Sequence, residues 1–336
     1  MSKPVTDMST TASPQLEKQA QTAADRLSQA KTAIGEVVYG QDHVVNLALA
    51  SMLSGGHTLL VGVPGLAKTL LVETLGTVMG LDNKRVQFTP DLMPADIIGS
   101  EVLEETAKGK RSFRFIPGPV FTQLLMADEI NRASPRTQSA LLQAMQERFV
   151  TVAGARHDLP APFHVLATQN PIEQEGTYPL PEAQLDRFLV QINVEFPDLE
   201  TEKTILLATT GASMASAKKV ITAKQLIEMQ KLVRKLPIGD NVVNAILTLT
   251  RNARPDQSDY DFIKNHVSWG PGPRAGQALM LATRAKALIE GRLSPSVDDV
   301  LDLASPVLRH RMAISFAARA EGESVEGIIA KLKAKI

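Results

Sequence analysis

The spacing of hydrophobic residues divides the chain into an alternating α/β part and a helical part. Apolar positions recur at helical spacing from Leu16 to Val37 and again from Val44 to Ser54. From there to about residue 195, short apolar runs alternate with helical patterns, which is typical of a parallel sheet covered by helices. The runs that we expect to form buried strands are His57–Val61, Arg85–Phe88, Gln123–Ala127, His164–Ala167 and Phe188–Val194.

This pattern predicts three regions along the chain. Residues 16–198 should form a three-layer αβα domain with a five-stranded parallel sheet, ending in the linker-like Phe196-Pro197-Asp198. Strand signals fade after this point, so residues 199–336 should form a small all-α domain. Residues 1–15 are rich in Ser, Thr and Pro and are expected to be a disordered tail.

Two segments inside the α/β part have the pattern of β-hairpins. In the first, Glu101–Glu105 and Arg111–Ile116 flank a turn at residues 107–110, and the second spans Phe149–Phe163 around Gly154. The first hairpin is basic through Lys108, Lys110, Arg111 and Arg114. Such a hairpin is either a solvated tip or a contact for an acidic protein segment or nucleic acid.

Composition excludes several classes of protein. The 36 basic residues balance the 36 acidic ones, so no overall charge favours nucleic acid or an anionic membrane. There is no cysteine, which excludes disulfides, thiolate metal sites and cysteine nucleophiles. The six histidines form no zinc-hydrolase pair. Neither a signal peptide nor an apolar run of about 18 residues is present, so we expect a soluble cytoplasmic protein without a membrane span.

A glycine-rich turn between the first strand and the next helix predicts a phosphate site. Residues 62–69 are GVPGLAKT, close to the pattern G-x-x-x-x-G-K-[ST]. Backbone N–H groups and the helix N-terminus would face an anion, Lys68 would reach the β- and γ-phosphates, and Thr69 would bind Mg²⁺. Ala67 replaces the second glycine and should tolerate helical backbone angles at a helix start. A plain tight turn is the alternative.

The third strand ends in two carboxylates, Asp128 and Glu129. In a doubly wound sheet, ligands bind beyond the carboxyl ends of the strands. Asp128 would therefore meet the Mg²⁺ held by Thr69, and Glu129 would polarise a water molecule toward the γ-phosphate. The alternative is that the pair caps the helix predicted at residues 136–148.

The fourth strand is followed by Asn170-Pro171. The Asn170 amide could hydrogen-bond the γ-phosphate or orient the attacking water. The alternative is an Asn-Pro turn with no role in chemistry.

Two arginines lie where they could approach a phosphate. Arg187 precedes the last strand and is predicted to reach the γ-phosphate of a neighbouring subunit as an arginine finger. A salt bridge with Asp186 or Glu182 is the alternative. Arg274 follows Pro273 in the first turn of a helix, where a cation is unfavourable unless an anion lies nearby. Bound phosphate would resolve that conflict, and an exposed arginine is the alternative.

Together these segments resemble the MoxR family of AAA+ ATPases, in the group with an insertion in the second helix. The resemblance covers roughly residues 20–335 and rests on GVPGLAKT (62–69), ADEINRASPRTQSALLQAMQE (127–147), ATQNP (167–171), EGTYPLPEAQLDRF (175–188) and GPGPRA (270–275). It implies that the two hairpins are the insertions of this group, which point toward a central pore or a partner.

The resemblance also implies a role for each site residue. Glu129, Asn170, Arg187 and Arg274 correspond to the catalytic Walker B glutamate, sensor 1, the arginine finger and sensor 2. Thr69 and Asp128 would bind the metal. The residues implied to bind nucleotide are Gly40, Gln41, Val63, Pro64, Gly65, Leu66, Ala67, Lys68, Thr69, Leu70 and Asp128.

The function implied is that of a homo-oligomeric, hexameric ring that hydrolyses Mg-ATP, bound between the α/β and helical domains, to activate or assemble client proteins. A von Willebrand factor A domain partner would be a separate chain. Two alternatives remain open. One is a nucleotide-dependent scaffold with negligible turnover. The other is a nucleic-acid motor. Zero net charge and 4% aromatic residues give little support for stacking on bases.

Overall fold

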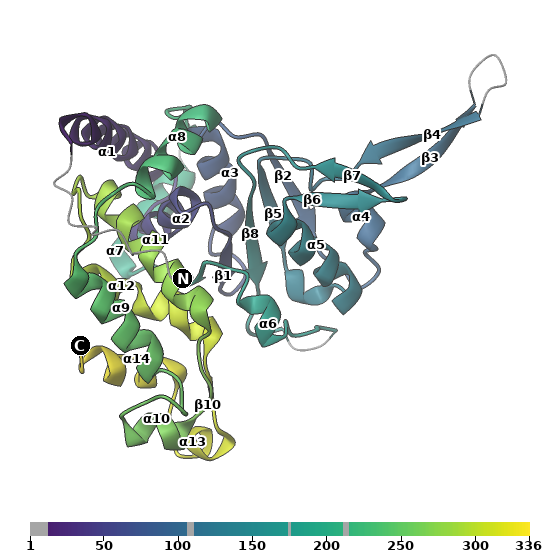
Figure 1. The fold of residues 1–336 in the computed structure, drawn as a ribbon. Helices are drawn as coiled ribbons and strands as arrows, with labels where there is room; N and C mark the ends of the chain where they lie inside the picture. Colours follow the sequence, from purple (N-terminus) through teal and green to yellow (C-terminus); the bar gives the residue numbers. More distant parts are fainter. Residues whose placement is uncertain (1–12, 106–110, 174–175, 211–214) are drawn as a thin grey trace, which may run out of the picture.

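The computed structural model describes residues 13–105, 111–173, 176–210 and 215–336 (Figure 1). Its centre is a parallel five-stranded sheet with the order β2-β5-β8-β1-β9. The five predicted strands are confirmed, and no strand end moves by more than two residues. Their bounds are β1 (Thr58–Val61), β2 (Asn83–Gln87), β5 (Leu124–Asp128), β8 (His164–Gln169) and β9 (Val190–Asn193).

Helices cover both faces of this sheet because the strands other than the polar edge strand β2 carry buried apolar side chains. Successive side chains alternate between the faces, so Leu59 packs in one core and Leu60 in the other. The Leu60 face carries α1 (Pro14–Gly35), α2 (Asp42–Leu53) and α3 (Lys68–Val78). The Leu59 face carries α4 (Pro94–Ile98) and α5 (Pro135–Glu147). The three-layer αβα architecture is therefore confirmed.

The first helix begins earlier than the sequence predicted. Ser13 caps α1 through its side chain, and Pro14 takes the first helical position, where its missing N–H costs nothing. The predicted tail at residues 1–15 is therefore corrected at its end. The rest of that prediction concerns residues 1–12, which lie outside the described residues.

Both predicted hairpins are present. The first consists of β3 (Gly99–Glu105) and β4 (Arg111–Pro117) and projects from the body of the molecule (Figure 1). The second consists of β6 (Phe149–Val152) and β7 (Ala155–Asp158). Phe115 of β4 stacks on His157 of β7, with ring centroids 3.8 Å apart, so the two hairpins support each other. Lys108 and Lys110 lie outside the described residues.

The rest of the chain folds as a mainly helical domain with one added strand pair. Its helices are α7 (Leu199–Thr209), α8 (Ala223–Val233), α9 (Asp240–Asn252), α10 (Asp261–His266), α11 (Pro273–Ile289), α12 (Val297–Leu308), η2 (Arg309–Arg311), α13 (Phe316–Ala320) and α14 (Val325–Lys333). The antiparallel strands β10 (Val267–Trp269) and β11 (Ala313–Ile314) were not included in the all-α prediction, because strands of two or three residues carry no detectable alternation.

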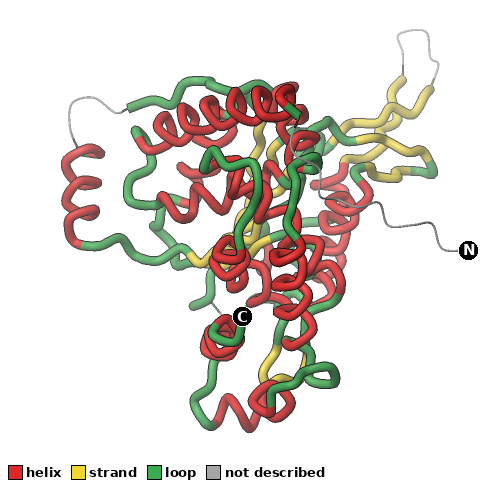
Figure 2. Tube along the Cα trace, turned by 60° about the vertical axis from the view of Figure 1, so that its left-hand side comes forward, coloured by secondary structure: helices red, strands yellow, loops and turns green. Residues whose placement is uncertain are grey.

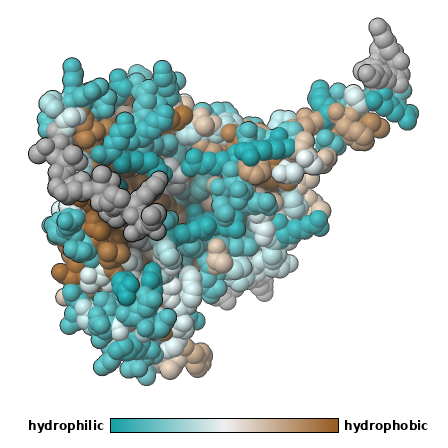
Figure 3. All heavy atoms as spheres, in the orientation of Figure 1, coloured by the Kyte–Doolittle hydropathy of each residue, from teal (hydrophilic) through white to brown (hydrophobic). Residues whose placement is uncertain are grey.

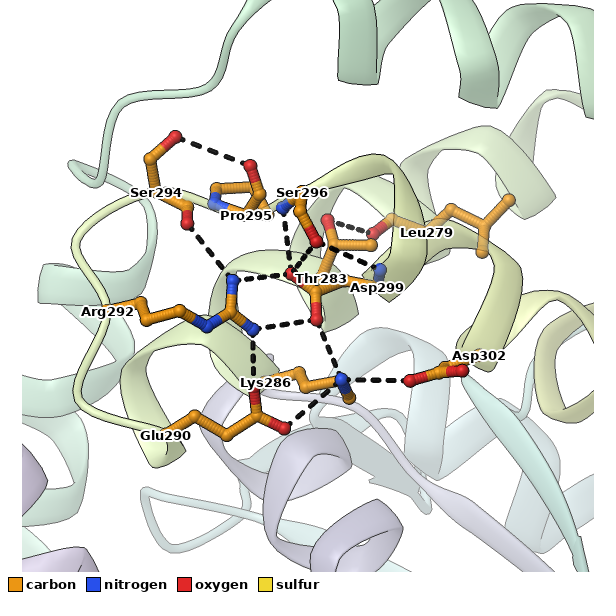
Figure 4. Close-up of polar contacts among 10 residues, drawn as sticks. All are labelled: Leu279, Thr283, Lys286, Glu290, Arg292, Ser294, Pro295, Ser296, Asp299 and Asp302. Carbon is orange, nitrogen blue, oxygen red and sulfur yellow. Dashed lines mark hydrogen bonds and ion pairs between the residues drawn. The ribbon is translucent and has the colours of Figure 1, made fainter. Parts of the chain in front are cut away.

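A charged network fixes the turn between α11 and α12 (Figure 4). Asp299 accepts hydrogen bonds from Lys286 at 2.7 Å and from Arg292 at 2.7 and 2.8 Å, and it also caps α12 through Ser296. Burial alone would raise the pKa of Asp299, but the hydrogen bonds from Arg292 and Lys286 lower it to about 2.

In the described part of the chain, no helix is long and apolar enough to cross a bilayer.

Candidate nucleotide site

The glycine-rich turn predicted to hold phosphate connects β1 to the N-terminus of α3. The Lys68 ammonium donates hydrogen bonds to the carbonyl oxygens of Gly62 at 2.6 Å and Val63 at 2.8 Å. Gln41, before α2, donates from Nε2 to the Leu66 carbonyl oxygen at 3.1 Å. Burial lowers the pKa of Lys68, although the nearby Asp128 and Glu129 oppose this shift. The cation is therefore held within the loop that would surround a phosphate.

The position that departs from the general pattern has an unexpected backbone conformation. Ala67 has φ 53° and ψ 22°, in the left-handed region that favours glycine. Our expectation that Ala67 would adopt ordinary helical angles is therefore wrong. An alanine in this conformation costs about 1 kcal/mol, which the loop and the start of α3 must supply. Strained backbone of this kind is common at ligand sites.

Polar side chains from three adjacent strands meet at Asp128 and Glu129. Thr168 Oγ1, at the end of β8, donates to Asp128 Oδ1 at 2.5 Å and accepts from the Glu129 N–H at 2.8 Å. Arg85 of β2 donates to Asp128 Oδ2 at 2.5 Å, and Gln87 donates to Glu129 Oε2 at 2.6 Å. The two carboxylates therefore lie side by side at the carboxyl edge of the sheet, each with a fixed orientation.

This network decides between the two interpretations of the carboxylate pair. The side chain that caps α5 is Ser134, so the capping alternative is wrong. Glu129 itself has φ 53°, a left-handed conformation that is rare for a non-glycine residue. Sequence reasoning missed Arg85, Gln87 and Thr168. The available signal was that polar residues end both strands that neighbour β5.

Asn170 lies just beyond β8, at the same edge as the carboxylates. Its Oδ1 accepts from the Ile172 N–H at 3.2 Å, and its Nδ2 donates to Glu173 at 3.3 Å. The Asn-Pro turn is therefore formed. Glu173 in turn pairs with Arg132, which also contacts Glu129, so the turn is linked to the carboxylate network.

A pocket of about 540 Å³ opens at the carboxyl end of β9, and Gln41 in its wall is hydrogen-bonded to Leu66 of the phosphate loop. Gly40 and Gln41 line one wall, and Pro306 and Arg309 of the helical domain line another. Gly40 has φ 67°, and a Cβ at this position would lie 2.2 Å from Thr201 of α7, so only glycine fits. The pocket therefore lies between the two domains, where the nucleotide was expected.

The residues present fit Mg-ATP. No cluster of three or more His, Cys, Asp or Glu side chains occurs among the described residues that could hold a metal alone. Mg²⁺ is usually bound by one or two carboxylates, with substrate phosphates and waters completing its shell, and Thr69 and Asp128 supply hard oxygen donors of this kind. At the pocket wall, Gln41 Oε1 is buried without a hydrogen-bond partner in the described structure, which fits the amino group of a base.

Arg187 and Arg274 lie together at the opposite edge of the sheet. Both line a hollow of about 370 Å³ beside Gly56 and His57, at the amino end of β1. Arg187 donates to the Leu142 carbonyl oxygen at 2.7 Å, and Arg274 lies 3.6 Å from Asp186. The predicted alternative, a salt bridge of Arg187 with Asp186 or Glu182, is wrong, because Asp186 pairs with Arg274 and Arg311 and neither acid lies within ion-pair distance of Arg187 in the described structure.

A buried arginine that the sequence reasoning missed fixes this edge. Arg311 is 2% exposed and donates to Asp186 Oδ1 at 2.7 Å. It also donates to the carbonyl oxygens of Phe188 at 2.6 Å and Leu189 at 3.1 Å. The helical domain thus holds the backbone on both sides of Arg187.

The two groups of residues lie at opposite ends of the strands. Thr58 of β1 pairs with Val190 of the parallel strand β9. Arg187, three residues before Val190, therefore lies at the amino end of these two strands, whereas the phosphate loop follows the carboxyl end of β1. The four residues of β1 span about 13 Å at about 3.3 Å each. The phosphate loop and the carboxylates lie at one edge of the sheet, and Arg187 and Arg274 lie at the other.

Comparison with known proteins agrees with this arrangement. A model of the ATPase family associated with various cellular activities (AAA) matches residues 57–190, and a model of the AAA lid domain matches residues 262–332. The fold and these matches define an AAA+ ATPase with a helical lid.

The relatives identify the family. Chaperone MoxR1 of Mycobacterium tuberculosis is 41% identical over 304 residues, which cover 90% of this chain and 80% of that protein. Protein MoxR of Paracoccus denitrificans is 30% identical, with 89% and 92% covered. The crystal structure of a putative ATPase from Cytophaga hutchinsonii superposes with a TM-score of 0.88 at 36% identity, covering 96% of this chain and 97% of that one. The chain belongs to the MoxR family of AAA+ ATPases.

Proposed function

We propose that the chain hydrolyses Mg-ATP at a site completed between two copies of itself. The observation that carries this proposal is the position of Arg187 and Arg274 at the amino edge of the sheet, away from the phosphate loop of the same chain. Four arginines line the hollow there: Arg148, Arg187, Arg274 and Arg311. The polyphosphate of a neighbouring copy would offset their mutual repulsion.

Each residue at the carboxyl edge then has a role in hydrolysis. Lys68 exchanges its bonds to the loop carbonyls for bonds to phosphate oxygens. Glu129 accepts a proton from the water that attacks the γ-phosphorus, and Asn170 orients that water. Mg²⁺ on Thr69 and Asp128 would neutralise charge on the phosphates. Arg187 and Arg274 of the neighbour stabilise the charge that develops in the transition state.

Such sites require a head-to-tail arrangement, which closes into a ring when the rotation permits. We propose a hexameric ring that activates or assembles client proteins, with a separate von Willebrand factor A domain protein as its partner. The relative from Mycobacterium tuberculosis is named a chaperone, which supports this class of activity. The projecting β3–β4 hairpin is the natural contact for a client or a partner, because it extends away from the body of the molecule.

The first test is ATP hydrolysis per subunit, measured across a wide range of protein concentration. A specific activity that rises and then saturates is expected, because the site forms only when two copies meet. Activity independent of concentration, down to concentrations where sedimentation shows only monomer, would contradict a site shared between subunits. Tight ATP binding without turnover at any concentration would instead favour a nucleotide-dependent scaffold.

A further inference from the structure

Helix α7 has an apolar surface that nothing else in the described structure covers. Leu199 is 77% exposed, Leu206 is 64% exposed and Leu207 is 70% exposed, and none of the residues in the helix is buried. Figure 2 shows this helix standing apart from the body of the molecule, on the left of the view. An isolated helix of this length gains little stability from its own backbone, so three exposed leucines indicate a missing partner.

The helix has a clear inner and outer side. Thr201, Ile205 and Ala208 are half-buried and, at helical spacing, lie on the side that faces the body. Leu199 and Leu206 are seven residues apart and lie on the opposite side. We call Leu199, Leu206 and Leu207 the leucine stripe.

A groove with matching character lies between α9 and α11. It has a volume of about 850 Å³ and shows on the left of Figure 3 as hydrophobic surface over the helical domain. Leu247 in this groove is 51% exposed. Its apolar lining consists of Val243, Ile246, Leu247, Met280 and Leu281. We call this surface the α9–α11 groove.

The charges around the two surfaces are opposite. Glu200 and Glu202 flank the leucine stripe and outnumber Lys203, the single basic residue of α7, whereas Arg234 and Arg251 line a groove that has no acidic lining residue. None of these side chains has an ion-pair partner among the described residues. Two copies of the groove would bring arginines together, and two copies of the leucine stripe would bring together surfaces that each carry a net negative charge. The pairing of stripe with groove is the one that satisfies both charge and hydrophobic contact.

The two surfaces also adjoin the two halves of the nucleotide site. Thr201 of α7 lines the pocket at the carboxyl end of β9. Gln277 and Leu281 of α11 line both the groove and the hollow that holds Arg187 and Arg274. A contact that brings stripe to groove therefore continues the contact that brings the two halves of the site together.

We propose that the leucine stripe of one copy docks in the α9–α11 groove of the next copy. This inference rests on the proposed function, because it supplies the contact that holds the shared site closed. The stripe and the groove lie at different places on one chain, so the contact is head-to-tail and propagates around a ring.

Cross-linking tests the contact directly, because the natural chain contains no cysteine. One preparation carries Leu206→Cys and a second carries Leu247→Cys, and a short bismaleimide is added with Mg-ATP. The mixture should give a covalent dimer that neither preparation gives alone. Phe316→Cys, on α13 and 88% exposed, is the matched control and should give no dimer with Leu206→Cys.

Charge reversal provides a second, independent measurement. Glu202→Arg or Arg251→Glu alone should raise the protein concentration for half-assembly at least tenfold. Mixing the two variants should restore assembly. The basic stripe of Glu202→Arg then meets the acidic groove of Arg251→Glu, and the acidic stripe of Arg251→Glu meets the basic groove of Glu202→Arg. Mant-ATP binding at monomer concentrations should be unchanged in both variants, which separates loss of the contact from loss of the nucleotide site.

The outcomes distinguish this inference from the proposed function. If wild-type rings form and hydrolyse ATP but Leu206 and Leu247 do not cross-link and charge reversal has no effect, the inference alone is overturned. A Leu206→Cys dimer formed without the second variant would show self-pairing and overturn it equally. If wild-type protein forms no assembly at any concentration with Mg-ATP, both the ring and this contact are wrong.

Discussion

The two edges of the central sheet are built in different ways. At the carboxyl edge, the predicted site residues lie soon after their own strands: Lys68 is seven residues after β1, Glu129 directly follows β5 and Asn170 directly follows β8. At the amino edge, Arg187 donates to the Leu142 carbonyl oxygen of α5, and its neighbours Asp186 and Phe188 are held by Arg311 of the helical domain, more than a hundred residues away in sequence. One edge is a set of short local motifs, and the other is assembled by tertiary contacts.

This difference means that the two edges depend on different parts of the structure. Backbone N–H groups and carboxylates at strand ends are fixed by the sheet itself, so under our proposal the carboxyl edge would bind nucleotide in a single copy. The amino edge depends on how the helical domain is seated on the α/β domain. Arg311 therefore links the position of that domain to the position of Arg187, so a movement of the helical domain would shift Arg187.

The largest expected effect is at the amino edge. Arg187→Ala should lower ATP turnover at least about 10³-fold, because a positive charge at the transition state is lost. Small amounts of this variant should also inhibit wild-type protein by more than their share. The measurement is turnover in mixtures of fixed total concentration, with Arg136→Ala, an exposed arginine on α5, as the control. Loss in strict proportion to the mixing ratio would mean that Arg187 acts within its own chain.

Removing the contacts of Arg311 with Asp186 and Phe188, on either side of Arg187, should have the next largest effect. Arg311→Met leaves the half-buried Asp186 with only the longer contact to Arg274 and leaves the Phe188 carbonyl oxygen without this donor, so it should lower the free energy of unfolding by about 3 kcal/mol. Urea unfolding measures this, with Arg319→Met at an exposed position of α13 as the control. Equal stability of the two variants would show that these contacts are dispensable.

At the carboxyl edge, Glu129→Gln should lower turnover at least about 10²-fold while ATP still binds, because the amide cannot accept the proton from water. Turnover and mant-ATP affinity are measured together. Glu147→Gln, at the exposed end of α5, is the matched control. Normal turnover by Glu129→Gln would remove this residue from the mechanism.

The amino edge should also be sensitive to acid. Burial lowers the pKa of His57 to about 3 and that of His164 to about 4. Val165 N–H donates to His57 Nδ1, a bond that protonation would break. The unfolded chain therefore binds more protons below pH 6.5, and stability contributed by each histidine should fall by about 2 kcal/mol from pH 6.5 to about pH 5. Urea unfolding at several pH values in this range measures the free energy of unfolding. This free energy should change less steeply with pH in His57→Gln than in wild type.

The smallest effect is expected at Ala67. Ala67→Gly removes the left-handed strain and should raise the free energy of unfolding by less than about 1 kcal/mol, with ATP affinity unchanged. Ala67→Val should have the opposite sign, because a β-branched residue is disfavoured there. Destabilisation by glycine would mean that the alanine methyl group makes contacts that outweigh the strain.

The sequence predicted the fold because its signals are local, and it placed the candidate residues Lys68, Asp128, Glu129 and Asn170 close to strand ends. Five apolar runs gave five strands, and the turn between β1 and α3 was recognisable from eight consecutive residues. The partners of the two carboxylates were not predicted. Arg85, Gln87 and Thr168 reach them only because β2 and β8 are the neighbours of β5, and strand order is not written in any single segment.

The sequence by itself determined the family, the five strands and the turn between β1 and α3, because strand, turn and helix signals act over a few residues. Only the tertiary structure decided that Arg274 lies beside Arg187 rather than beside its own phosphate loop. It also decided that Arg311 fixes Asp186 and that α7 keeps its leucines exposed. These features depend on how the helical domain packs on the sheet, and that packing is set by contacts between residues far apart in the chain.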